Sequence, residues 1–321
     1  MIKIVEVGPR DGLQNESRIV PADVKVDFIN ALSGSGVSEI EVSSFVSPKM
    51  IPQLKDAGFV FEKITRRKNC IYSALVPNER GFDKALDAGV DKISLFTAAS
   101  ETFNRKNIHT TIEGSLERFR PVISRALEQG LPIRVYISTA LWCAFEGRIP
   151  PEKVLKLALR LIDMGVDELS ISDTIGKATP DEVAQLLEIL LSSVPKEMIA
   201  VHFHDTYGNG IENVLTSASF GIRTFDASAG GLGGCPFAPG ATGNVSTEAV
   251  VIALEKAGFQ TDVDIAQLIQ AGNLLTPHLG AGTPRMPEPD SLACSTCEFF
   301  DGKTCCGRFR TESDSQRAAS K

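Results

Sequence analysis

The chain is poor in histidine, tyrosine and tryptophan, with four, three and one of these residues among 321. It has no apolar run near the about 18 residues of a membrane-spanning helix, so none is predicted. Basic stretches are also missing and the net charge is −7, which argues against nucleic-acid binding. Met1 leads straight into the first expected strand, which leaves no room for a signal peptide. Together with seven cysteines, this predicts free thiols in the cytoplasm.

What the chain does have is an alternation of strand-like and helix-like segments. It is 43% hydrophobic, enough for a large core. Eight short runs rich in Val and Ile are expected to be buried strands, at residues 2–8, 39–45, 71–76, 92–97, 132–138, 168–172, 199–204 and 224–228. Helical patterns lie between them, at residues 21–32, 81–88, 112–129, 151–164 and 180–193. Glycines are placed to end successive helices, namely Gly36, Gly89, Gly130, Gly165 and Gly221.

This organisation predicts an α/β fold of the (β/α)8 TIM-barrel type, with repeating units of about 30 residues. A doubly wound sheet is the alternative, but no Gly-x-Gly-x-x-Gly turn follows the first strand. We expect the barrel domain to span residues 1–279, followed by a polar tail at 280–321.

Two of the four histidines stand together in the seventh expected strand, in the run Val201-His202-Phe203-His204. Alternate residues of a strand point to the same face, so both imidazoles can reach one metal ion. Val201 and Phe203 would then pack on the other side. The alternative is a pair of hydrogen-bonded core histidines.

Arg10 and Asp11 follow the first expected strand. An aspartate oxygen with two imidazole nitrogens is a plausible ligand set for a divalent cation, and the adjacent arginine could hold a substrate carbonyl or carboxylate. The alternative is a surface ion pair of little energetic value. In a barrel, the active site lies at the C-terminal ends of the strands. The residues found at or near such ends are Asp11, Glu41, Asp173, His202 and His204.

A glycine-rich run follows the eighth expected strand, at residues 229–244. Cys235 lies in it among backbone amides that could lower the pKa of its thiol. Asn244 could give an oxygen to a metal or a hydrogen bond to a substrate. We interpret this run as a mobile flap that carries a reactive thiol; a flexible linker is the alternative.

These motifs together resemble the 3-hydroxy-3-methylglutaryl-CoA lyase family, over residues 3–275. The resemblance rests on residues 5–16, 44–49, 173–176 and 202–208 and, most specifically, on the Cys235 loop. Isopropylmalate and homocitrate synthases share the Arg-Asp-Gly and His-x-His motifs but do not typically carry a Gly-Gly-Cys-Pro loop. The resemblance implies a TIM barrel, commonly a homodimer, that cleaves 3-hydroxy-3-methylglutaryl-CoA to acetyl-CoA and acetoacetate in leucine degradation.

The family's residues carry over by position. The resemblance implies Mg2+ or Mn2+ held by Asp11, His202, His204 and Asn244. It implies catalytic roles for Arg10, Glu41, Asp173, His202 and Cys235, with Arg10 and Gln14 binding the acyl-CoA substrate. In retro-aldol cleavage, Arg10 would stabilise the oxyanion and Cys235 would protonate the enolate. Asp173, or a water that it orients, would remove the hydroxyl proton.

Two positions depart from the family's usual pattern. Trp142 stands in the loop after the fifth strand, and Thr97 stands where glycine is common. Both could reshape the acyl pocket, which keeps citramalyl-CoA as an alternative substrate. A condensing synthase and a non-catalytic acyl-CoA-binding barrel are less favoured alternatives.

The tail beyond residue 280 is outside the resemblance. It contains four thiols, those of Cys294, Cys297, Cys305 and Cys306. Their spacing is poor for a zinc finger, so we expect an exposed tail rather than a metal site. The sequence assigns it no function.

Overall fold

The computed structural model describes residues 1–233 and 243–280. Its eight parallel strands close into a barrel in the order β1-β10-β9-β8-β5-β4-β3-β2. These strands are β1 (Lys3–Glu6), β2 (Glu39–Ser44), β3 (Ile71–Leu75), β4 (Lys92–Ala98), β5 (Ile133–Ser138), β8 (Glu168–Asp173), β9 (Ile199–Phe203) and β10 (Thr224–Ala227). The predicted (β/α)8 barrel and all eight predicted strands are therefore confirmed, with bounds that agree within two residues.

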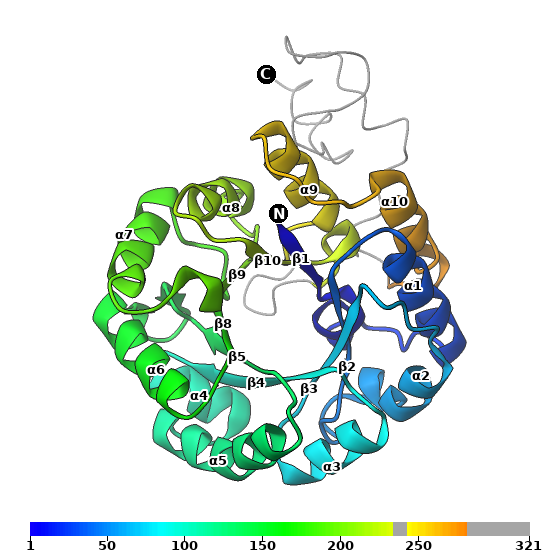
Figure 1. Cartoon of the computed structure of the whole chain (residues 1–321), viewed down its shortest axis with the longest axis horizontal. Helices are drawn as coiled ribbons and strands as arrows, with labels where there is room; N and C mark the ends of the chain where they lie inside the picture. The colour runs from blue at the N-terminus through cyan, green and yellow to red at the C-terminus, as the bar shows by residue number, and fades with distance from the viewer. Residues whose placement is uncertain (234–242, 281–321) are drawn as a thin grey trace, which may run out of the picture.

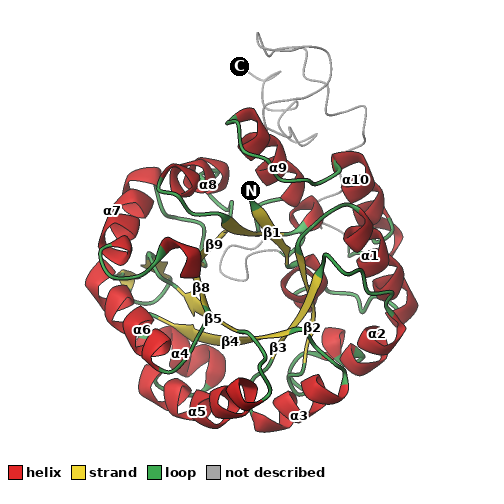
Figure 2. Ribbon diagram, in the orientation of Figure 1, coloured by secondary structure: helices red, strands yellow, loops and turns green. Residues whose placement is uncertain are grey.

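Helices surround the barrel as an outer ring (Figures 1 and 2). They are α1 (Ala22–Gly34), α2 (Ala57–Lys63), α3 (Glu79–Asp87), α4 (Glu101–Ile108), α5 (Ile112–Glu128), α6 (Pro151–Asp163), α7 (Pro180–Leu191), α8 (Gly210–Ser219), α9 (Thr247–Lys256) and α10 (Ile265–Asn273). Short 3-10 turns lie at Pro52–Leu54, Lys196–Met198, Ala229–Gly231 and Thr276–His278. The sequence patterns missed α2, α4, α8, α9 and α10, and also a small hairpin of β6 (Trp142–Cys143) and β7 (Gly147–Arg148).

Local chemistry explains where the helices begin and end. The side chain of Thr179 accepts from the amide of Glu182, whose carboxylate accepts from Thr179 in return, so a capping box starts α7. All five glycines predicted to end helices have positive φ. At Gly36, with φ 93°, a Cβ would lie 2.2 Å from the Asp262 oxygen, so glycine is required there. None of the helices in the described part of the chain combines the length and the apolar character that a membrane span requires.

The apolar core lies between the outer face of the barrel and the helices. Ile4, Ile40 and Ile93 are fully buried on that outer face. The inner face is charged instead: Lys3, Glu39, Lys92, Arg134 and Glu168 form one ion-pair network near the N-terminal ends of the strands. Barrel interiors are usually filled by branched apolar residues, so this barrel carries an unusually polar centre below its mouth.

Candidate active site

A tight turn at the end of β1 positions Asp11. The chain enters a π-helical turn at Gly8–Gly12, and the Asp11 amide donates to the Val7 carbonyl at 2.7 Å. Glu6 braces the turn, because its Oε1 accepts from the Gly8 amide at 2.8 Å. A Cβ at Gly8 would lie 2.6 Å from that oxygen, which explains the glycine.

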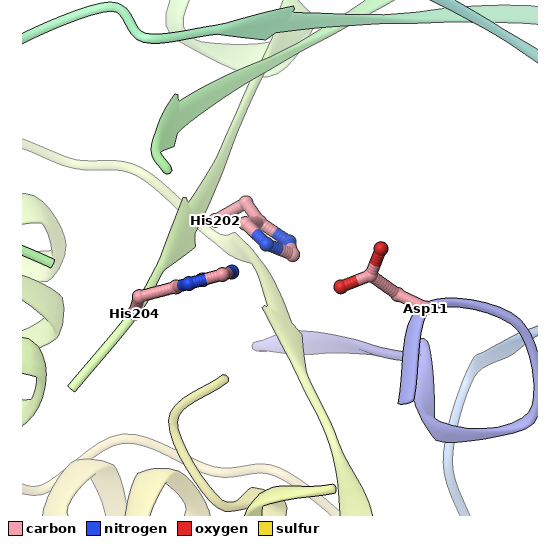
Figure 3. A group of neighbouring side chains, drawn as sticks. All are labelled: Asp11, His202 and His204. Atoms are coloured by element: carbon pink, nitrogen blue, oxygen red, sulfur yellow. The ribbon is translucent and has the colours of Figure 1, made fainter. Parts of the chain in front are cut away.

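Asp11, His202 and His204 converge at the barrel mouth. One ligand atom from each lies within 4.8 Å of the other two. Figure 3 shows the two imidazoles reaching from one strand toward the Asp11 carboxylate on its turn. The sequence predicted this convergence, and the three side chains lie close enough to share one cation.

Asn244 joins the group from the segment that pairs with His204. Its Nδ2 donates to Asp11 Oδ2 and to the Leu232 carbonyl, both at 3.0 Å. Its Oδ1 and the Nδ1 of His204 are buried and have no hydrogen-bond partner among the described residues. Buried polar atoms are normally satisfied. A carboxylate, imidazoles and an orphaned amide oxygen are therefore a donor set that fits a divalent cation.

The protonation states of this group also suit a cation. Burial opposes ionisation of Asp11, but Arg10 and the two imidazoles lower its pKa to about 2. Burial and the neighbouring His202 lower the pKa of His204 to about 4. Near neutral pH the group therefore offers an ionised carboxylate and a neutral imidazole, the forms that bind metal.

Arg10 is locked beside this group. Its Nε lies 2.5 Å from Glu41 Oε2 and its Nη1 lies 2.5 Å from Asp11 Oδ1. The guanidinium sits 5.0 Å from the centre of the Tyr136 ring, whose hydroxyl donates to Glu41 Oε2 at 3.0 Å. Gln14 donates to Asp11 Oδ1 at 3.0 Å. The structure thus groups Arg10, Glu41 and Gln14 around Asp11.

Two residues of this site were missed from the sequence. Tyr136 lies under Arg10, and the buried Asp226 has its Oδ2 3.3 Å from His202 Nδ1. The sequence signal that could have found them is a polar residue at the positions of a strand that face the barrel interior. In β5 the polar Arg134 and Tyr136 take every second position, and in β10 one acid interrupts an apolar run.

Asp173 is not part of the metal-ligand group. Asp173 pairs in register with Phe203, while Ser172 pairs with His202. Because side chains alternate along a strand, Asp173 points to the face of the sheet opposite to the one that carries His202. Its Oδ2 accepts from the Ala178 amide at 2.8 Å. Burial raises the pKa of Asp173 to about 6. The carboxylate therefore braces the loop that leads to α7 rather than facing the ligands.

The structure also corrects the expectation that Thr97 shapes an acyl pocket. Its hydroxyl contacts Ser115 Oγ at 2.7 Å and accepts from Asn104 at 3.1 Å, so it points toward the helices. Trp142 in β6 donates to Glu182 at 2.9 Å, and Lys177 lies 3.8 Å from its ring centre. Trp142 is thus tied to the start of α7.

The two stems of the glycine-rich run meet at the ligand group. The Asn244 amide donates to the Gly233 carbonyl at 3.3 Å. A Cβ at Gly233, where φ is 102°, would lie 2.8 Å from Asn244 Nδ2 and 3.1 Å from Gly12 Cα. Cys235 and the four tail cysteines lie outside the described residues.

Glu6 joins one of these stems to the Asp11 turn, and it makes a testable pH-dependent contribution. Its carboxylate accepts from Gly8, Ala229 and Thr247. Burial raises its pKa from 4.5 to about 7, so the folded state binds the proton more tightly. Stability from this group is then greatest below pH 4.5 and is lost as the pH rises through 7. The shift corresponds to on the order of 3 kcal/mol.

Glu6→Gln keeps the shape and an acceptor for both amides but removes the titration. We therefore expect the unfolding free energy of the variant, minus that of the unmodified chain, to increase between pH 5 and pH 8 in urea titrations. A pH-independent difference would contradict the assignment of this proton to Glu6.

The fold and site together define a (β/α)8 barrel with an oxygen- and imidazole-lined cation site at its mouth. The chain matches the HMGL-like family over residues 1–275, and it belongs to that family, that of the 3-hydroxy-3-methylglutaryl-CoA lyases.

Individual relatives and structures agree with this assignment. The cytoplasmic 3-hydroxy-3-methylglutaryl-CoA lyase of Danio rerio is 46% identical over 88% of this chain and 84% of that protein. The mitochondrial hydroxymethylglutaryl-CoA lyase of Rattus norvegicus is 43% identical over 93% of this chain and 90% of its own length. The HMG-CoA lyase structure from Bacillus subtilis superposes with a TM-score of 0.87, at 44% identity, and the match covers 90% of this chain and 96% of that one. An HMG-CoA lyase from Acinetobacter baumannii, solved with coenzyme A and 3-methylmalate, gives 0.85 at 40% identity, with 92% and 96% covered.

Proposed function

We propose that this chain is a carbon–carbon lyase that cleaves 3-hydroxy-3-methylglutaryl-CoA to acetyl-CoA and acetoacetate, with Mg2+ or Mn2+ as cofactor. The observation that carries the proposal is the convergence of Asp11, His202 and His204 beside the locked Arg10. The family supports it, as does the coenzyme A complex of the related Acinetobacter baumannii enzyme.

The cation would be held by Asp11, His202, His204 and the Oδ1 of Asn244. When bound, it lowers the pKa of the substrate hydroxyl and orients it. The selection of Mg2+ or Mn2+ rests on the donor set, which combines two oxygens with two imidazoles and contains no thiolate.

The chain's own residues then divide the remaining work. As the C–C bond breaks, its electron pair moves onto the thioester and the hydroxyl carbon becomes the ketone of acetoacetate. Arg10 faces the charge that develops on the thioester oxygen, and its contacts with Glu41 and Asp11 fix it in advance, so little reorganisation is needed. Cys235 gives its proton to the new acetyl carbon.

The hydroxyl proton needs an acceptor. Glu41 Oε1 is buried and has no hydrogen-bond partner in the described part of the chain. The Oδ1 of Asp173 is likewise buried without a partner among the described residues, but Asp173 occupies the other set of strand positions, whereas Glu41 is paired with Arg10 beside the ligand group. We assign the proton to Glu41, directly or through water, and give Asp173 the role of bracing the loop before α7.

We further propose that the enzyme is a cytoplasmic homodimer that acts in leucine degradation. The name of the Danio rerio relative supports the cytoplasm, whereas the Rattus norvegicus relative is named mitochondrial. Light scattering on the purified chain tests the oligomeric state, and fractionation of its native cells tests the location.

Metal removal is the direct test of the reaction. We expect excess chelator to abolish turnover of 3-hydroxy-3-methylglutaryl-CoA, because the hydroxyl then keeps its ordinary pKa, and Mg2+ or Mn2+ to restore it. Citramalyl-CoA assayed in parallel should turn over much more slowly, since the Thr97 hydroxyl is bonded to Ser115 and Asn104 and the Trp142 indole to Glu182, rather than to the ligand group. Full activity in chelator contradicts the metal role, and a preference for citramalyl-CoA contradicts the substrate.

A further inference from the structure

A buried acid outside the proposed ligand set touches it from below. Asp226 lies on β10, where its register partner on β9 is His202. Its side chain is fully enclosed, and its Oδ2 lies 3.3 Å from His202 Nδ1. We propose that Asp226 is a positioning residue: it accepts the Nδ1 proton of His202, fixes the ring, and so directs Nε2 to the cation. This inference rests on the proposed function, because it needs a cation at the barrel mouth.

Asp226 is itself held in place. Ser170 Oγ donates to its Oδ2 at 2.9 Å, and Arg134 Nη2 donates to its Oδ1. Arg134 in turn pairs with Glu168 at 3.0 Å. The carboxylate therefore cannot rotate freely, and the lone pairs of Oδ2 remain directed at both Ser170 and the imidazole.

The chemistry of histidine makes this contact consequential. A neutral imidazole carries one proton, and the nitrogen that keeps it cannot bind a metal. An acceptor beside Nδ1 favours the proton there and leaves the Nε2 lone pair free. Carboxylates that bind the second nitrogen of a ligating histidine raise its basicity and fix its plane. The Nδ1 of His202 is buried and makes no hydrogen bond to any other described residue, so the carboxylate 3.3 Å away is the acceptor within reach.

A purely structural role is the competing explanation, in which Asp226 only neutralises Arg134. Burying an ion pair costs desolvation, and apolar replacements of such pairs are often neutral or stabilising. Stability alone therefore does not explain why the charged Asp226 is buried inside the barrel. Glu168 separates the two explanations, because it also neutralises Arg134. It lies two inner positions before Ser172 on β8, and Ser172 is the residue that pairs in register with His202, so Glu168 is farther from the imidazole.

The test compares Asp226→Asn with Glu168→Gln in the full-length chain. Mn2+ binding is measured from the electron paramagnetic resonance signal of free Mn2+, without substrate. We expect Mn2+ affinity to fall by roughly 10- to 100-fold in Asp226→Asn and by no more than about twofold in Glu168→Gln. Thermal unfolding of both variants gives the structural effect independently. Nitrogen couplings of Mn2+-bound imidazole should weaken only in Asp226→Asn.

Each outcome has a defined meaning. Equal losses of Mn2+ affinity in the two variants, or unchanged affinity in Asp226→Asn, overturn the positioning role. If Asp226→Asn does not fold, Ser170→Ala decides, since it keeps every charge; severalfold weaker Mn2+ binding supports the role and unchanged binding overturns it. If the unmodified chain binds no Mn2+, the proposed metal site itself fails, which is a separate result.

Discussion

Arg10→Lys is expected to lower kcat by roughly 10²–10³-fold or more, the loss typical of one oxyanion donor. Lysine keeps the charge but loses the planar fork, which here spans Glu41 and Asp11 while resting on the Tyr136 ring. An ammonium group cannot hold all of these contacts and also face the substrate. The KM should change much less than kcat, because the lost contact forms as the C–C bond breaks.

The measurement is steady-state turnover at saturating Mg2+, with Mn2+ affinity checked in the same preparation. Arg120→Lys is the matched control, since Arg120 is exposed on α5 and its ion pair is with the equally exposed Glu117, at 3.0 Å. A near-normal kcat for Arg10→Lys removes Arg10 from the mechanism. An equal loss in Arg120→Lys would mean that the assay reports folding instead.

The fold was predictable because a (β/α)8 barrel leaves a strong periodic record in its sequence. Runs such as 199–204 are buried on both faces, and glycines with positive φ end the helices between them. The short α2 and α4 left no such record. Each spans about two turns, so its few buried apolar residues, such as Val60 in α2 and Phe103 in α4, do not repeat often enough to show helical periodicity in the sequence.

The site was predictable where chemistry and spacing coincide. His202 and His204 alternate on one strand, and Asp11 follows another strand that ends at the same face. Asp226 escaped because it is one acid in an apolar strand, and Tyr136 because it is one of several polar residues that alternate in β5. Only the closed barrel shows that their inner positions adjoin His202 and Arg10. Asp173 was placed at the correct strand end, but the direction of its side chain depends on the loop amides that it accepts from.

Cys235→Ser is expected to keep the fold and the Mn2+ affinity but to lose most of the activity. A hydroxyl is a far weaker acid than a thiol, so it matches proton transfer to the enolate carbon poorly. The position of Gly233, two residues before Cys235, supports this role of the cysteine. Gly233 lies against Gly12 and Asn244, beside the metal-ligand group.

The four tail cysteines supply the comparison for Cys235. The barrel that carries Asp11, His202 and His204 is complete by residue 280, so changing Cys294, Cys297, Cys305 and Cys306 together to serine should leave turnover of the reduced enzyme nearly intact. Substrate should also protect Cys235 from alkylation, because a thiol that reaches the acetyl carbon is covered once the acyl-CoA is bound, while the tail thiols stay reactive. Turnover of both variants under reducing conditions, with alkylation mapped by mass spectrometry with and without substrate, decides the matter. An active Cys235→Ser enzyme would exclude Cys235 as the proton donor. An inactive but folded tail variant would instead assign the proton donor to the tail.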